Sequence, residues 1–394
     1  MSERALKDNE LAKLTIKGFK SIKELVDFEL KPLNVLIGAN GSGKSNLISF
    51  FKMYRSLMDD ELQTYIINNG RMDNVLFNGR KMTEFMEFET HFGPRGHRFK
   101  LFSHPDNTAY IKDEARFYDQ SRGEPDWWEL GDNHDAKSQV VAEVKENRSD
   151  ARLSKRVYNA ILSWKVYHFH DTSPTAGMRF PQEALQGGRE RLRADGSNIA
   201  PFLLYIRSNF PKQYRRIVQS IKAIAPFFKD FSLDAVEEGP RRMVNLHWHQ
   251  NGTDNPMQPY HLSDGTIRFI CLAAVLLQPE PPATIVIDEP ELGLHPAALV
   301  ILAELIEEAS AKMQIIMGTH SPRLLDYFSI TDIIAVNRNR ENGASMFERL
   351  EMEKYKEWLD EDTIGDLWLK NDISARPVYE KSIAAQKEKS LQNN

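Results

Sequence analysis

The chain has little cysteine: Cys271 is the only one among 394 residues. It can therefore form no internal disulfide and no metal site built from several cysteines. Cys271 lies in the apolar run Phe269–Ala273, which predicts a packed position in a helix. This cysteine usage indicates a reducing, cytoplasmic environment.

The sequence also lacks a long hydrophobic run and an excess of positive charge. No window approaches the roughly 18 apolar residues that span a bilayer, so we expect no membrane association. The polar start Met1–Arg4 has no apolar signal core. A net charge of −5 excludes a uniformly basic coat for nucleic acid but leaves room for a local groove. Hydrophobic content of 41% is enough for a core, and the length allows two or three domains.

What the sequence does contain is a glycine-rich motif, Gly38–Ser45 (GANGSGKS), which fits G-x-x-x-x-G-K-[ST] at every fixed position. The largely apolar residues 33–37 predict a buried strand before it, and residues 46–51 predict a helix after it. Glycines let the backbone curve around phosphate oxygens, and the helix start adds its positive dipole end. The motif predicts that Lys44 reaches the β- and γ-phosphates of a nucleotide and that Ser45 ligates Mg²⁺.

Hydrophobic patterning predicts the elements around this motif. Period-two alternation favours strands over residues 11–19, 25–33, 84–92, 97–102 and 108–117, the last three as an antiparallel meander. Residues 120–152 are rich in polar residues, Gly and Pro and are predicted to be mostly loop. Residues 385–394 are polar and predict a frayed end.

In the second half, strands alternate with helices. We expect strands over 165–170, 243–248, 284–287 and 314–317, and helices over 199–208, 212–225, 267–277 and 297–309. Apolar strands between helices are typical of a mostly parallel, helix-covered sheet. His168 and His170 share one face of the first of these strands. A metal site is one interpretation, but no third ligand is evident, which favours an ordinary strand face.

Three further segments carry candidate chemistry. The strand 284–287 runs into Asp288 and Glu289, which could orient Mg²⁺ and direct an attacking water, respectively. The segment 262–266 (LSDGT) predicts a second anion-binding helix start with the Ser263 hydroxyl. His320 follows the strand 314–317, where it could hydrogen-bond a γ-phosphate; a structural histidine is the alternative.

The order of the motifs GANGSGKS, LSDGT, IVIDEPE, LGLHP and THSP resembles the ABC-type ATPase head of the SMC, RecF and OLD group. The openings LTIKGFKSIKE and LNVLIGANGSGKSNLI are similar to the start of those heads as well. Within the group, the segments RADGSN and IGDLW look like the short, coiled-coil-free ATPases of bacteria and prophages that are labelled AAA-family. The resemblance covers nearly the whole chain.

The resemblance implies an α/β fold in which a mostly parallel sheet flanked by helices joins an N-terminal antiparallel β lobe, with a helical insertion. It implies ATP and Mg²⁺ as cofactors and an ATP hydrolase activity. The implied catalytic residues are Lys44, Glu289 and His320, and Ser45 and Asp288 would ligate the metal. The implied nucleotide-binding residues are Gly38, Asn40, Gly41, Ser42, Gly43, Lys44, Ser45, Asn46, Ser263 and Gly265.

In such heads, two protomers share their ATP sites head to tail, so we expect a homodimer or higher oligomer. Ser263 and Gly265 would touch the γ-phosphate held by the other subunit, and Leu292–Pro296 would cross the interface. The signature reads LSDGT instead of LSGGQ, and no glutamine can be placed that would link the γ-phosphate to the lobe interface. Gln63 is too close to the phosphate-loop helix to take that role.

The predicted boundaries place the first part of the nucleotide-binding domain in residues 1–58 and an inserted β lobe with a helical region in 59–254. The second part of the nucleotide-binding domain would occupy 255–340, followed by a C-terminal extension over 341–394. The chain is too short after His320 for the Toprim nuclease of OLD proteins, and it lacks an SMC-like coiled coil.

Two functions remain open. The first is an ATPase whose heads close on ATP and gate a partner, in DNA maintenance and repair or in anti-phage defence with an effector nuclease or toxin. The second is a nucleotide-gated scaffold with little turnover that holds such an effector. DNA is a possible partner if a surface of arginines contacts its phosphates: Arg179, Arg189, Arg191, Arg193, Arg241 and Arg242. A solvated basic face is the alternative.

Overall fold

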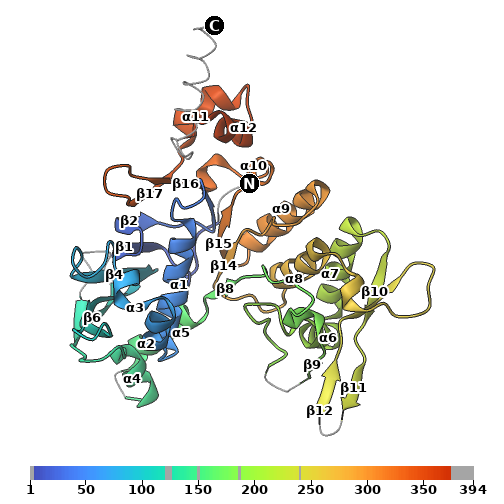
Figure 1. The fold of residues 1–394 in the computed structure, drawn as a ribbon, viewed down its shortest axis with the longest axis horizontal. Coiled ribbons are helices and arrows are strands. Elements are labelled where there is room, and N and C mark those ends of the chain that lie inside the picture. Colours follow the sequence, from blue (N-terminus) through green and yellow to red (C-terminus); the bar gives the residue numbers. More distant parts are fainter. Residues whose placement is uncertain (1–3, 120–126, 149–150, 185–187, 239–240, 374–394) are drawn as a thin grey trace. The chain divides into compact units, whose positions relative to one another are not determined.

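The structure is a computed structural model that describes residues 4–119, 127–148, 151–184, 188–238 and 241–373 (Figure 1). The tail predicted over 385–394 lies outside these residues. The chain divides into two compact units, Met1–Trp164 with Gly318–Asn394, and Lys165–Met317. The domain boundaries predicted after residues 58, 254 and 340 stay predictions.

The first unit contains an antiparallel sheet with the strand order β2-β1-β4-β5-β6-β7. Its strands are β1 (Lys13–Phe19), β2 (Ile22–Glu29), β4 (Phe85–Phe92), β5 (Arg95–Ser103), β6 (Ala109–Tyr118) and β7 (Trp127–Gly131). Alternate residues of β4 are buried, as expected for a sheet with one face on the core. The predicted antiparallel meander of β4, β5 and β6 is confirmed.

Helix α1 (Lys44–Met58) fixes this sheet to the loop that precedes the helix. Tyr54, in its second half, is fully buried, and its hydroxyl lies 2.8 Å from Nδ1 of His97 on β5. Nε2 of His97 lies 3.0 Å from a carboxylate oxygen of Glu114, which also accepts from the backbone N–H of Gln139. Because Tyr54, His97 and Glu114 all have partners in this network, it locks α1 to the sheet in one register.

The first unit also holds α2 (Leu62–Asn68), α3 (Arg71–Val75), α4 (Gln139–Lys145) and α5 (Arg152–Leu162). Residues 120–152, predicted to be rich in loop, also contain β7 and α4 among the residues that the structure describes. Trp127 of β7 packs edge-on against Phe117 of the neighbouring strand, and α4 buries Val140 and Val141. These long-range contacts outweigh the polar local composition.

A second group of strands in this unit carries the glycine-rich loop. Strand β3 (Leu33–Ile37) is buried throughout and runs parallel to β16 (Ile333–Arg338), which pairs antiparallel with β17 (Ser345–Arg349). The remaining elements are α10 (Pro322–Leu325), the 3₁₀ turn η3 (Ile330–Asp332), α11 (Met352–Leu359) and α12 (Ile364–Lys370).

The second unit is built on the parallel pair β8 (Lys165–Tyr167) and β14 (Thr284–Asp288). The helix α8 (Asp264–Leu276) buries every residue from Ile267 onward, and Cys271 lies within it as predicted. Burial raises the pKa of the Cys271 thiol to about 12, so this thiol is inert at neutral pH. The other helices are α6 (Ile199–Asn209), α7 (Pro211–Ile224) and α9 (Pro296–Ser310), and β15 (Gln314–Thr319) leads out of the unit.

Two strand predictions in this unit need correction. Residues 243–248 form two strands, β12 (Arg241–Val244) and β13 (His247–Gln250), because the chain leaves one partner for another. β12 pairs with β11 (Ala235–Glu238) and β9 (Gln182–Glu183), whereas β13 pairs with β10 (Phe228–Ser232). The strand predicted over 165–170 ends at Tyr167. Two 3₁₀ turns, η1 (Gly177–Arg179) and η2 (Pro259–His261), complete the unit.

Candidate functional site

The glycine-rich loop joins β3 to the first turn of α1, as predicted. Gly43 caps the helix with a φ of 116°, and a side chain at this position would overlap Ser345 of β17. Only glycine combines this φ with so little space. The Lys44 ammonium is nearly buried and folds back onto the loop, where it donates to the carbonyls of Gly38 at 2.7 Å and Ala39 at 3.3 Å. A buried cation beside the positive end of a helix is suited to an anion.

A directional chain of hydrogen bonds supports the loop from beneath. The Ser345 hydroxyl donates to the carbonyl of Ser42 at 2.6 Å, so its only hydrogen is used. The Ser21 hydroxyl, 2.6 Å from that of Ser345, must then donate to it and accepts from the amide of Asn46 at 2.6 Å. Two segments distant in sequence, at Ser21 and Ser345, therefore fix the loop. Asn46 uses its side-chain amide here, and its predicted nucleotide contact stays a prediction.

A pocket of about 510 Å³ opens beside the first turn of α1. Arg338, at the end of β16, lines it and donates to the loop carbonyl of Gly41 at 3.1 Å. Lys20 lines it too, held by Ser49 and Asn69, and burial lowers its pKa, with Lys52 adding to the effect. Sequence reasoning missed both cations, because only the fold brings Lys20 and Arg338 to one pocket. Gln63 makes a structural contact instead: its side-chain oxygen accepts from the backbone of Ala109.

His320 directly follows β15 and is half-buried. Thr319 and Ser321 shape the turn at this point: the Thr319 hydroxyl accepts from the backbone N–H of Ser321 at 3.0 Å. Ser321 in turn caps α10 by accepting from Leu324. The predicted role of His320 at a γ-phosphate stays a prediction.

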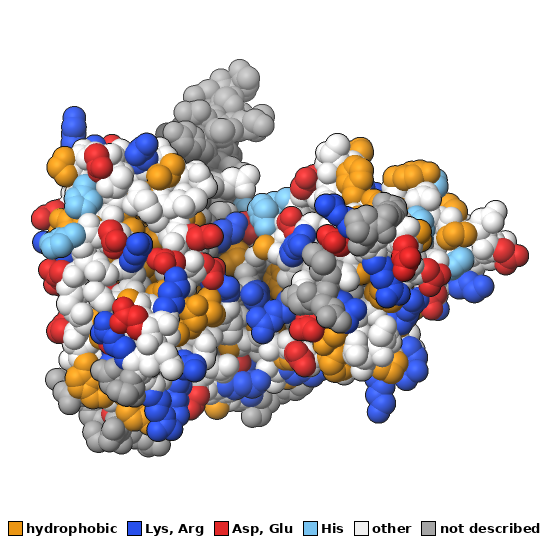
Figure 2. All heavy atoms as spheres, turned by 90° about the horizontal axis from the view of Figure 1, so that it is seen from below, with side chains coloured by type: hydrophobic (Ala, Val, Ile, Leu, Met, Phe, Trp, Pro, Cys, Tyr) orange, Lys and Arg blue, Asp and Glu red, His pale blue; other side chains and the backbone are white. Residues whose placement is uncertain are grey.

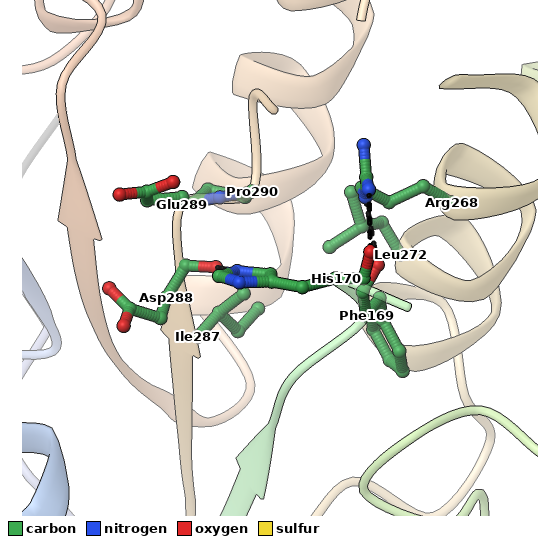
Figure 3. A pocket seen from close by; sticks show the side chains of 8 residues that line it. All are labelled: Phe169, His170, Arg268, Leu272, Ile287, Asp288, Glu289 and Pro290. Carbon is green, nitrogen blue, oxygen red and sulfur yellow. Dashed lines mark hydrogen bonds between the residues drawn. The ribbon is translucent and has the colours of Figure 1, made fainter. Parts of the chain in front are cut away.

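The acidic residues Asp288 and Glu289 stand at the end of β14 in the second unit. Glu289 adopts a left-handed backbone with a φ of 46°, which is uncommon for a residue with a side chain and is often found at functional positions. Figure 3 shows both carboxylates directed to the same side, away from Arg268. They line a narrow pocket with Phe169, His170, Arg268, Leu272, Ile287 and Pro290.

The predicted helix start at Ser263 is confirmed, with the hydroxyl of this N-cap accepting from the backbone of Thr266 at 3.1 Å. The chain of the following turn contacts the loop after Glu289 directly, because a side chain on Gly265 would overlap the carbonyl of Gly293. Within the second unit, the structure therefore brings the signature turn against the loop that follows the acidic strand.

Arg268 holds these segments together. It is 5% exposed and donates to the carbonyls of Phe169 at 2.8 Å, of His170 at 3.2 Å and of Leu292. Burial lowers the pKa of its guanidinium, and Asp264 opposes that shift. Arginine still keeps its charge at neutral pH. Sequence reasoning missed Arg268, and it considered His170 only as a metal ligand or as part of a strand face, although His170 follows the short strand β8 as Glu289 follows β14.

One of the arginines considered for a DNA-binding surface, Arg179, is not available at the surface. Arg179 is 7% exposed at its side chain and donates to the carbonyls of Thr172, Pro259 and Leu262 and to Asp264. It therefore braces the signature turn. Four others are exposed: Arg191, Arg193, Arg241 and Arg242. On the face drawn in Figure 2, cationic side chains are interspersed with acidic ones.

The predicted residues thus fall into two sets. The glycine-rich loop with Lys44 and Ser45, and His320, belong to the first unit; Ser263, Gly265, Asp288 and Glu289 belong to the second. Among the described residues, no group of three or more His, Cys, Asp and Glu could hold a metal, which leaves His168 and His170 without the set that the metal interpretation needs. Ser45 and Asp288 carry oxygen atoms, the ligand type that Mg²⁺ prefers.

Comparison with known proteins assigns the class. The family model described as "AAA domain, putative AbiEii toxin, Type IV TA system" matches residues 33–326, and the chain belongs to this family. No curated protein matches the sequence. In the part of the chain that the structure describes, we find no helix with the length and apolar character needed to cross a membrane.

Solved structures show that the fold is that of an SMC-type ATPase head. The "SmcHead bound to the C-winged helix domain of ScpA" is 20% identical with a TM-score of 0.55, covering 88% of this chain and 99% of that one. A second SMC head, with an extended coiled coil and bound to the C-terminal domain of ScpA, derives from Pyrococcus furiosus. It is 16% identical with a TM-score of 0.51, covering 89% and 99%. The predicted fold class is confirmed.

Proposed function

We propose that this protein is a Mg²⁺-dependent ATPase whose ATP-bound heads dimerise and gate a partner protein. The observation that supports it best is the loop before α1, where the buried Lys44 lies at the helix N-terminus, an arrangement suited to an anion. The pocket beside that loop, with Lys20 and Arg338, would receive the rest of the nucleotide. The family membership agrees with nucleotide binding.

In this proposal each set of residues has a distinct task. Lys44 moves from the Gly38 carbonyl to the phosphates, and backbone N–H groups of the loop hold their oxygens. Glu289 accepts the proton of the attacking water, and His320 hydrogen-bonds the γ-phosphate. Ser45 and Asp288 would hold Mg²⁺, which neutralises charge that develops on the phosphates. Bringing the two sets onto one nucleotide is part of the proposal.

Ser263 and Gly265 would complete the site of a second copy, so that closure of two heads depends on ATP. The resulting switch would act on a partner in the cytoplasm. The family description, which names a putative toxin of a toxin–antitoxin system, supports an effector of that kind, in anti-phage defence or DNA maintenance. The SMC heads that share the fold were solved with ScpA bound, which supports a partner-binding head.

A scaffold with little turnover is the second candidate. It is favoured by one observation: none of the residues that line the acidic pocket is a glutamine, the residue expected from the resemblance at the γ-phosphate. ATP would then hold the effector complex together, and the effector would perform the chemistry.

Single-turnover hydrolysis of ATP separates the two candidates. Glu289→Gln should bind ATP normally and lower the rate about 10²- to 10⁴-fold, because it removes the general base. Lys44→Ala should abolish ATP binding, whereas Glu304→Gln, the same chemical change on an exposed part of α9, should leave the rate unchanged. Equal rates for the wild type and Glu289→Gln would rule out the ATPase and favour the scaffold.

A further inference from the structure

The end of β8 lies beside the end of β14, and the two strands run parallel with Tyr167 opposite Ile287. Because parallel strands finish at the same edge, the residues after Tyr167 come next to Asp288 and Glu289. Nε2 of His170 is 3.1 Å from the carbonyl oxygen of Asp288. Figure 3 shows the His170 ring next to Asp288, in the pocket that the two acids share with Arg268.

This hydrogen bond has a defined direction. A carbonyl oxygen can only accept, so Nε2 of His170 carries the hydrogen and donates it. The ring also packs against the imidazole of His168, and the two ring centroids are 4.0 Å apart. The main chain of His170 is held as well, because its carbonyl accepts from Arg268 at 3.2 Å. His170 is therefore fixed at both its ring and its backbone.

The group that His170 contacts controls the backbone of Glu289. The carbonyl of Asp288 belongs to the peptide that joins 288 to 289, and the orientation of that peptide sets φ of Glu289. Glu289 has a φ of 46°, a conformation that persists only where its surroundings impose it. Pro290, which follows, disfavours the right-handed helical alternative at 289. A donor aimed at the Asp288 carbonyl is one such constraint.

We propose that His170 is a positioning residue for Glu289: its Nε2–H fixes the Asp288–Glu289 peptide and so aims the Glu289 carboxylate. This inference rests on the proposed ATPase function and adds a residue to its catalytic edge. His170 also supplies a hydrogen-bonding side chain in a pocket whose lining includes no glutamine. Its action passes through Glu289, so its loss affects the chemical step and leaves ATP binding intact.

Two substitutions separate the hydrogen bond from the shape of the ring. His170→Phe keeps a ring for packing and loses the donor, whereas His170→Gln loses the ring and offers an amide N–H at a similar reach. We expect His170→Phe to lower the single-turnover rate about 10- to 100-fold, as is usual for residues that orient a catalytic group. Its ATP affinity should change less than about threefold, and His170→Gln should recover most of the rate. His168→Phe is the matched control and should stay within about twofold of the wild type.

The Glu289→Gln background provides the second readout. If His170 acts through Glu289, adding His170→Phe to Glu289→Gln should cause no further loss of rate. Independent, multiplicative losses would overturn the proposal, as would a His170→Phe protein with wild-type rate or a His170→Gln protein as slow as Phe. A circular-dichroism melt of each variant shows that it is folded. If the wild type and Glu289→Gln hydrolyse ATP at equal rates, both the ATPase proposal and this inference fail. If Glu289→Gln is slower than the wild type but His170→Phe hydrolyses ATP at the wild-type rate, only this inference fails.

Discussion

The glycine-rich loop of the first unit and the acidic edge of the second are held in different ways. The loop rests on a chain of neutral hydrogen bonds through Ser21 and Ser345, and its carbonyls also accept from Lys44 and Arg338. The acidic edge rests on a buried cation, Arg268, that donates to the carbonyls of three residues in two separate loops. The loop therefore shares its support among several side chains, whereas the guanidinium at the acidic edge concentrates it in one. The second region should therefore be the more sensitive to a single substitution.

The largest effect should come from Arg268→Met. It leaves the carbonyls of Phe169, His170 and Leu292 without this charged donor, so local opening should become easier by about 2–4 kcal/mol. Hydrogen exchange at the backbone N–H of Leu292, which bonds the Glu289 carbonyl, measures that opening. ATP hydrolysis should fall at least as far as in His170→Phe.

Arg268→Lys is the control for charge, and its single ammonium cannot replace a fork that reaches three carbonyls. It should recover only a minor part of the protection. If Leu292 is as well protected in Arg268→Met as in the wild type, the acidic edge does not depend on Arg268, and the contrast between the two regions fails.

Gly43→Ala tests the loop at its most constrained point and should rank second. An alanine there is strained by the φ of 116° and overlaps Ser345, which together cost about 1–3 kcal/mol. ATP affinity should fall by about 10- to 100-fold in a calorimetric titration.

Gly41→Ala is the matched control, because Gly41 also has a left-handed φ, of 75°, but nothing lies near its Cβ position. Gly41→Ala therefore measures the effect of backbone strain alone, and it should lose less ATP affinity than Gly43→Ala. Adding Ser345→Ala to Gly43→Ala should restore part of the loss. If Gly41→Ala and Gly43→Ala lose the same ATP affinity, the close packing of Gly43 against Ser345 contributes nothing to that affinity.

The same contrast explains what the sequence could predict. The strand β3, the loop and α1 follow from local pattern, because a buried strand, glycines at fixed spacing and a helix start lie within 26 consecutive residues, 33–58. The acids at the end of β14 follow for the same reason. The hydrogen bonds that support these two regions cannot be predicted from local pattern. Ser345 donates to a carbonyl 303 positions away in the sequence, and Arg268 donates to a carbonyl 99 positions away. Residues 243–248 were predicted as one strand because alternation does not reveal that β12 and β13 have different partners.

The smallest effect should come from Ser345→Ala. It removes one donor to the Ser42 carbonyl and one acceptor for Ser21, which together support the loop by about 1 kcal/mol. ATP affinity should fall about fivefold, and Ser329→Ala, which removes an exposed hydroxyl in the same unit, should change nothing.

Ser21→Ala sharpens this test, because Ser21 and Ser345 belong to one hydrogen-bonded chain. Once either hydroxyl is gone the link between Asn46 and the Ser42 carbonyl is already broken, so the double variant should lose less than the sum of the single losses. Additive losses would mean that the two serines act separately. If Ser345→Ala destabilised the loop by as much free energy as Arg268→Met destabilises the acidic edge, the loop, too, would depend on one side chain. Neutral and charged hydrogen bonds would then concentrate their support equally.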